Sequence, residues 1–294
     1  MFVLAHLSDI HLPPLPRPRL SELISKRGLG YLNWLRKRRA LHRREVLDAL
    51  VTDLKAQAPD HIAVTGDLVN LSLTSEFGPA RTWLESLGAP EQVSFVPGNH
   101  DSYVRAAAGE KTRHWGDYMR GDRGDTFPFV RRRGRIAIVG VSTSLPTFPL
   151  SATGTVGPEQ RALLAQALDA LGREGAFRVV LIHHPPVPRN RYPRRLTDAG
   201  PIRDLLRQHG AELVLHGHHH ESSLIWLSGP RFAIPCVGVP AASGALGHHD
   251  EPAAYNLYGI DGEPGAWRCT LTARGFSNET DGISMLSQTE LADH

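Results

Sequence analysis

Five short polar clusters in the chain have residue types that suit metal binding. Asp and Asn offer hard oxygen ligands and His offers a borderline nitrogen, a mixture that favours Mn, Fe or Zn over Mg alone. None of the clusters carries a Ser or Cys nucleophile. The clusters are Asp9 with His11, Gly66–Asp67, Gly98–Asn99–His100–Asp101, His183, and Gly217–His218–His219–His220.

Each cluster comes directly after a predicted buried strand. Short apolar runs predict strands over residues 2–7, 61–65, 93–96, 178–182 and 212–215. In an open α/β sheet the carboxyl ends of the strands meet at one crevice. One cluster alone could be a turn former or a core histidine, but turn chemistry does not explain five such strand ends. We therefore expect the clusters to form one site.

Glycines stand immediately before several of these polar residues. Gly66, Gly98 and Gly217 each precede a candidate ligand. Without a Cβ, the backbone can turn sharply and approach an ion closely. We expect strained backbone near the site.

The remaining chain alternates helices and strands and then changes to hairpins. Helices are predicted over 41–57, 75–87, from Pro158, and over 201–209, with a further strand over 136–141. Residues 275–294 are polar with weak periodicity, so we expect a catalytic domain over 1–274 and a loosely held C-terminal tail. The hairpin strands are predicted at 223–227, 231–237, 255–261 and 266–274.

In this order, the five motifs resemble the calcineurin-like metallophosphoesterase family. The match spans Asp9 to His220. Residues 66–70, Gly-Asp-Leu-Val-Asn, and residues 215–218, Leu-His-Gly-His, particularly resemble the bacterial class III cyclic-nucleotide phosphodiesterase branch. The resemblance implies an α/β fold, a four-layer αββα sandwich of two mixed β-sheets flanked by helices, with a binuclear metal site at the strand ends.

The resemblance also implies roles for individual residues. Asp67 would bridge two divalent or trivalent transition-metal ions, with His100 as a non-ligand general acid and Asp101 orienting its ring. Two cations about 3.5–4 Å apart lower the pKa of a bridging water, so hydroxide would be the nucleophile. The other implied ligands are Asp9, His11 and His220 on one metal, and Asn99, His183 and His218 on the other.

Eleven of the sixteen histidines have no place in this assignment. His216 and His219 lie beside ligands, and strand alternation predicts that both point away from the site. His184 precedes two prolines and is expected to shape its loop. His248–His249–Asp250 is expected to be solvated.

Composition limits the function classes. The net charge of +3, from 33 basic and 30 acidic residues, argues against a stable nucleic-acid partner. Cys236 and Cys269 fit neither a zinc ribbon nor a disulfide scaffold. No signal peptide or membrane span is evident from the sequence, and we expect a cytoplasmic protein.

A basic insert, about residues 13–40, lengthens the connection between His11 and the first long helix. From Arg17 to Arg44 ten Lys or Arg residues face one acid, Glu22, and apolar residues such as Trp34 are interspersed. Three interpretations remain open: a solvated helix, a cationic rim that binds substrate, and a peripheral anchor on an anionic inner-membrane surface.

The sequence leaves three functions open. The first is a phosphodiesterase acting on a small phosphate ester, with a nucleotide as one option. The second is a pyrophosphate or lipid-phosphate hydrolase that resembles UDP-diacylglucosamine hydrolase, and the third is a catalytically silent metal-binding scaffold. The intact ligand set and His100 count against the third.

Overall fold

The computed structural model describes residues 1–124, 126–187, 193–246, 251–277 and 280–293. Within these residues the first sheet has six strands, and its central strand β1 pairs in parallel with β2 and antiparallel with β10. In order across the sheet the strands are β12 (Thr280–Asp293), β11 (Ala266–Ser277), β10 (Ala254–Glu263), β1 (Phe2–Leu7), β2 (His61–Val64) and β3 (Val93–Phe95).

The second sheet, also six-stranded within the described residues, has a parallel centre and antiparallel edges. Its central strands are buried along their whole length, as is usual for parallel strands covered on both faces. In order across the sheet the strands are β4 (Phe129–Arg133), β5 (Ile136–Val141), β6 (Phe177–Ile182), β7 (Leu213–His216), β9 (Ile234–Gly238) and β8 (Ser223–Leu227).

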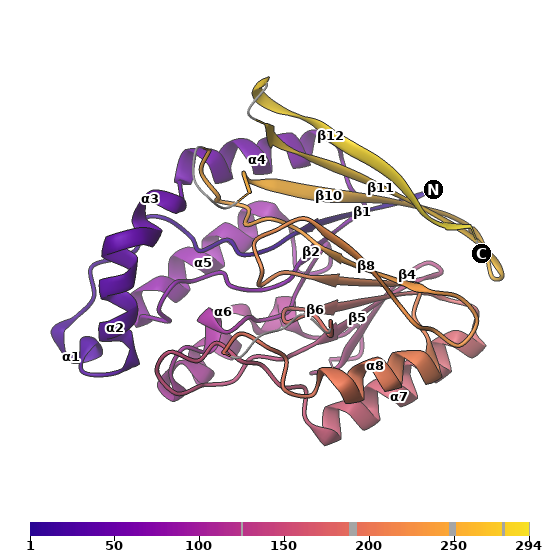
Figure 1. Ribbon diagram of the computed structural model, residues 1–294, viewed down its shortest axis with the longest axis horizontal. Coiled ribbons are helices and arrows are strands. Elements are labelled where there is room, and N and C mark those ends of the chain that lie inside the picture. The colour runs from indigo at the N-terminus through magenta and orange to yellow at the C-terminus, as the bar shows by residue number, and fades with distance from the viewer. Residues whose placement is uncertain (125, 188–192, 247–250, 278–279, 294) are drawn as a thin grey trace.

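Helices cover the outer faces of both sheets (Figure 1). In α7, Pro158 occupies the first helical position, and Leu164, Leu168 and Leu171 form the stripe that packs on the second sheet. The first sheet carries α4 (Arg44–Ala56), α5 (Thr74–Leu87) and α6 (Ala108–Trp115), and the second carries α7 (Pro158–Arg173) and α8 (Ala199–His209).

A third apolar layer lies between the sheets. It joins Leu4 and Tyr258 of the first sheet to Phe177 and Leu181 of the second. The chain thus forms the expected αββα sandwich, with the two sheets packed face to face.

The insert consists of short helices that extend beyond the sheets at one end of the molecule (Figure 1). Its inner side packs Tyr31 and Trp34 against a small apolar cluster that contains Leu71 and Leu73. The elements are α1 (Leu20–Leu23), α2 (Lys26–Asn33), the π-helical segment η1 (Trp34–Arg38) and α3 (Arg39–Leu41); short 3₁₀ segments elsewhere are η2 (His100–Ser102), η3 (Arg105–Ala107) and η4 (Gly116–Met119).

The structure corrects two expectations about the elements. The described residues after 274 are not loosely held, because β12 pairs antiparallel with β11 along most of its length. Strand β4 lies in a stretch for which the sequence predicted no strand, and its partner β5 supplies its hydrogen bonds. The placement of the catalytic-domain boundary near residue 274 stays a prediction.

Candidate metal centre

The strand ends of both sheets place the polar clusters at one edge of the sandwich. Asp9 and His11 follow β1, Asp67 follows β2, and His183 follows β6 of the other sheet. The loops after β1 and β2 are joined by backbone hydrogen bonds, among them His11 N to Asp67 O at 2.9 Å. The expectation that distant clusters share one crevice is confirmed by this arrangement.

The backbone is strained at the predicted ligands. Asp9, His11, Asp67, His218 and His220 all have positive φ angles, between 39° and 73°. This left-handed region is costly for residues with a Cβ, and such strain clusters at functional sites. The concentration of strain predicted from the glycines is thus observed at the candidate ligands themselves.

At the glycines before the candidate ligands, other side chains occupy the position that a Cβ would take. A Cβ on Gly98 would lie 2.7 Å from Cε1 of His183 and would overlap the Asp67 carboxylate. A Cβ on Gly217 would lie 2.5 Å from Oδ2 of Asp9. These glycines therefore allow the ligand-bearing loops to close on one another.

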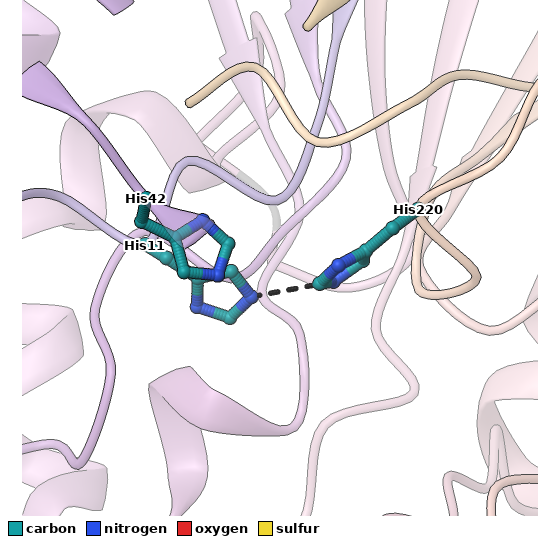
Figure 2. Close-up of side chains that lie close together, drawn as sticks. All are labelled: His11, His42 and His220. Atoms are coloured by element: carbon teal, nitrogen blue, oxygen red, sulfur yellow. Dashed lines mark hydrogen bonds between the residues drawn. The ribbon is translucent and has the colours of Figure 1, made fainter. Parts of the chain in front are cut away.

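One group of candidate ligand atoms comes from Asp9, His11 and His220. Nε2 of His220 lies 3.2 Å from Oδ1 of Asp9 and 3.4 Å from Nε2 of His11. His42, which follows the insert, lies beside them, as Figure 2 shows, and its ring is 4.6 Å from that of His11. Three histidines and a carboxylate thus face one another here.

A second group surrounds His183. Its Nε2 lies 3.3 Å from Oδ1 of Asn99 and 3.4 Å from Oδ2 of Asp67. The same Oδ2 atom of Asp67 lies 3.9 Å from Nε2 of His11 in the first group. Asp67 therefore stands between the two groups, where a bridging ligand would be required.

The donor set fits metal ions. Ligands at about 2.0–2.1 Å from a tetrahedral centre lie roughly 3.4 Å apart, close to the separations found here. Oδ1 of Asp9 is buried and has no hydrogen-bond partner, and within the described residues the ion pairs of Asp9 and Asp67 are with histidines alone. Two buried carboxylates without a Lys or Arg partner leave a negative charge that cations would balance.

Backbone carbonyls orient two of the rings. Nδ1 of His11 lies 3.3 Å from the Val69 carbonyl, and Nδ1 of His183 lies 2.6 Å from the Thr65 carbonyl. Since a carbonyl only accepts, each Nδ1 carries the proton, and Nε2 is directed toward the site.

Burial and charge set the protonation of these groups. Burial lowers the pKa of His11 and of His218 well below the ordinary value, which favours the neutral form that binds metal. Burial lowers the pKa of His183 too, but Asp67 and Asp9 outweigh it and raise that pKa to about 9. A proton on His183 thus balances the carboxylates, and a bound cation would release it.

His218 joins the second group less directly. Its ring lies 5.1 Å from that of His183, while its Nε2 lies 2.8 Å from the Arg194 carbonyl. Its backbone N–H donates to Oδ2 of Asp9 over 2.9 Å. His218 therefore ties both groups to the loop after β7.

The structure corrects the role expected of Asp101. Its carboxylate accepts hydrogen bonds from the backbone N–H groups of Asp67 and Gly98, both at 2.8 Å, and of Leu68 at 2.9 Å. The His100 ring instead hydrogen-bonds through Nδ1 to the Asn70 carbonyl. Asp101 therefore fixes the loop that carries Asp67, and Asn70 orients His100.

Two further residues reach the site: Arg38, one of the basic residues of the insert expected to form a cationic rim, and His42, which follows the insert and which the sequence did not single out. Nη1 of Arg38 lies 2.9 Å from Nε2 of His100. His42 is buried, and its Nδ1 lies 2.8 Å from the Ser243 hydroxyl. Burial and the Arg38 charge lower the pKa of His100 to about 3. The basic run of the insert was the signal for Arg38, whereas no motif marks His42.

A cavity of about 560 Å³ opens over the two groups. Its lining includes Lys26, Leu29 and Arg38 of the insert, and Leu150 and Arg194 from other segments. His100 and Asp67 lie at the cavity surface, so a ligand in it would reach the candidate metal site.

The other histidines behave differently from one another. Both ring nitrogens of His184 are engaged, by Thr143 at 2.7 Å and by the Ala152 carbonyl at 3.0 Å, which confirms its role in the loop. His216 is buried away from the cavity, whereas His219 lines it, because strand alternation stops where β7 ends. His248–His249–Asp250 lies outside the described residues.

Comparisons with known proteins agree with this geometry. A sequence profile described as calcineurin-like phosphoesterase matches residues 2–222. A search of curated proteins found no match. The solved structures that share the fold include two phosphatases, both at low sequence identity.

The first is a dimetal phosphatase from Danio rerio, with a TM-score of 0.66 and 11% identity over 100% of this chain and 99% of that chain. The second is a purple acid phosphatase from yellow lupin (Lupinus luteus), with a TM-score of 0.59 and 12% identity over 97% of this chain and 53% of that chain.

Proposed function

Because this chain belongs to the calcineurin-like phosphoesterase family, we propose that it is a binuclear metal-dependent hydrolase of phosphate esters, acting on diesters. The observation that carries the proposal is the position of Asp67. Its Oδ2 atom lies near His11 of one donor group and His183 of the other, at 3.9 and 3.4 Å. One carboxylate shared by two donor groups is the arrangement that a two-metal site needs.

Each metal has its own set of ligands in this proposal, and the two sets share one residue. Asp67 is common to both, and the nearby His42 lies against Ser243 at the edge of the first set. When bound, two such cations supply Lewis-acid stabilisation of the phosphoryl oxygens and lower the pKa of water at the site. The ligands proposed are Asp9, His11, Asp67 and His220 for the first metal, and Asp67, Asn99, His183 and His218 for the second.

His100 is proposed to protonate the departing oxygen. The Nδ1–H of His100 donates to the Asn70 carbonyl, so Nε2 is the ring atom that faces the cavity and Arg38. A phosphate oxygen that enters between Arg38 and His100 would accept hydrogen bonds from both side chains. The added negative charge favours the protonated ring, which then donates to the leaving group.

Diester hydrolysis is the finer part of the proposal. It rests on the Gly-Asp-Leu-Val-Asn run at residues 66–70, which resembles the class III cyclic-nucleotide phosphodiesterases. The second candidate, a lipid-phosphate or pyrophosphate hydrolase, is favoured by one observation, the apolar side chains Leu29 and Leu150 that line the cavity. Assays of diesters, monoesters and lipid pyrophosphates with Mn separate the two.

The expected result is Mn-dependent hydrolysis of bis-p-nitrophenyl phosphate with a higher kcat/KM than the monoester. A higher kcat/KM for lipid pyrophosphates would favour the second candidate. Absence of hydrolysis of every substrate by protein loaded with Mn, Fe or Zn would leave only the scaffold hypothesis.

Arg38 is expected to bind the substrate phosphate. Replacing Arg38 by Gln should raise KM about tenfold or more, because a hydrogen bond to a charged group contributes about 1.5–3 kcal/mol. Arg36→Gln is the matched control, since Arg36 is exposed and does not line the cavity. Steady-state kinetics on a soluble diester measure the KM of both variants. Equal KM values for the two variants would remove Arg38 from the binding site.

A further inference from the structure

The insert exposes large apolar side chains on its outer side. Ile24 is 87% exposed and Leu20 is 83% exposed, while Leu29, Leu32 and Leu35 are each about half exposed. The last three recur every three residues along α2 and η1, so they form one stripe of a nearly continuous helix. A helix surface in water ordinarily carries polar residues at such positions.

The inner side of the insert is firmly held, so the outer side is a separate surface. Arg27 is buried and donates to the backbone carbonyls of Leu71 and Ser72. Tyr31 and Trp34 pack against the body of the protein. Arg27, Tyr31 and Trp34 thus attach the insert, whereas the Leu stripe, Leu20 and Ile24 remain exposed.

A second segment continues the apolar surface across the cavity mouth. Phe148 is 87% exposed, and Leu150, also exposed, lines the cavity together with Leu29 of the insert. Nζ of Lys26 donates to the Thr147 hydroxyl at 2.7 Å and to the Ser151 carbonyl at 2.9 Å. The loop that carries both side chains is therefore fastened to the insert.

Positive charge borders these apolar residues. Arg17, Arg19, Arg36 and Arg39 of the insert are exposed. The single acid of the segment, Glu22, is occupied by backbone N–H groups and by Arg27 at 3.7 Å. The insert thus combines exposed apolar residues with exposed cations that outnumber its acids.

We propose that this surface, the insert together with Phe148 and Leu150, docks the protein on an anionic lipid bilayer. A helix of this composition lies in the plane of the interface, with its apolar side chains below the headgroups and its Arg side chains on anionic lipids. Within the described residues no helix is long and apolar enough to cross a bilayer. A protein partner would not require the excess of Arg that surrounds the apolar stripe.

Docking would place the cavity mouth at the lipid surface, because Leu29 and Leu150 belong both to the surface and to the cavity. The substrate would then be a phosphate ester that carries an apolar tail. This consequence rests on the proposed function, whereas docking itself does not.

The test is co-sedimentation with vesicles of phosphatidylcholine alone or mixed with phosphatidylglycerol. The apolar variant is Leu32→Ser with Leu35→Ser and Phe148→Ser, none of which lines the cavity. Its matched control replaces three exposed side chains elsewhere, Leu163, Leu224 and Trp226, by Ser.

The native chain should bind the mixed vesicles at least tenfold more tightly than phosphatidylcholine alone. The apolar variant should lose at least tenfold in binding, and its control should bind like the native chain. Arg36→Gln with Arg39→Gln should weaken binding to mixed vesicles alone. Salt should also weaken binding, because the Debye length falls from about 10 Å at 0.1 M to about 3 Å at 1 M.

Equal vesicle binding by the apolar variant and its control would overturn the proposal. It would also be overturned if the native chain did not bind vesicles and instead formed dimers, seen by sedimentation velocity, that the apolar variant does not form. Hydrolysis of a soluble diester by the same samples distinguishes the docking proposal from the proposed hydrolase activity. The apolar variant should keep its kcat. A native chain that binds vesicles but does not hydrolyse the diester would contradict the hydrolase activity and leave docking supported.

Discussion

Asp67→Asn should lower kcat/KM for phosphate esters about 10³-fold, because a bridging carboxylate becomes a neutral amide. Loss of Lewis-acid stabilisation worth about 4 kcal/mol corresponds to this factor. The change keeps the shape of the side chain. The backbone N–H of His100 donates to Oδ1 of Asp67 over 2.7 Å, and an amide oxygen can still accept this hydrogen bond. The fold should therefore persist while metal affinity falls.

Asp198→Asn is the matched control. Asp198 is also a buried carboxylate, but it accepts from the backbone N–H groups of Val156 and Gly157 and pairs with Arg161, away from the cavity. It should lower thermal stability and leave bound metal unchanged. If Asp67→Asn retained metal and activity to the same degree as Asp198→Asn, Asp67 would not be the bridge.

His100→Ala should keep bound metal and slow the hydrolysis of alkyl esters by about 10²–10⁴-fold, the usual contribution of a general acid. The loss should be much smaller for p-nitrophenyl esters, because nitrophenolate departs without a proton. Kinetics on the two ester types, together with metal analysis, measure this difference.

His114→Ala serves as the control for the loss of an imidazole, since His114 lies on α6 and does not line the cavity. It should leave both rates unchanged. Equal losses of His100→Ala on the two ester types would contradict the acid assignment, and so would loss of a metal.

The αββα architecture could be predicted because its strands are local apolar runs. β1, β6 and β7 are buried along most of their length, and their sequences show it without any partner being known. The polar residues after them could be assigned to one site because parallel strands bring their carboxyl ends to the same edge. Strand topology and residue composition were therefore sufficient to predict the architecture and the location of the site.

Contacts between distant segments could not be predicted. The partners of Asp101 are backbone N–H groups on the loop after β2, and those groups have no sequence signature. Arg38 reaches His100 across 62 residues, a contact decided by how the insert packs. β12 looked like a tail because its half-exposed strand is stabilised by pairing with β11 rather than by a strong apolar pattern.

The number of metal ions bound per chain tests the central claim most directly. Elemental analysis of the folded protein after loading with Mn, Fe or Zn should find about two ions per chain, because one site would leave either the His11 or the His183 donor group without a cation. A folded, metal-saturated sample that holds one ion or fewer per chain would contradict the binuclear centre.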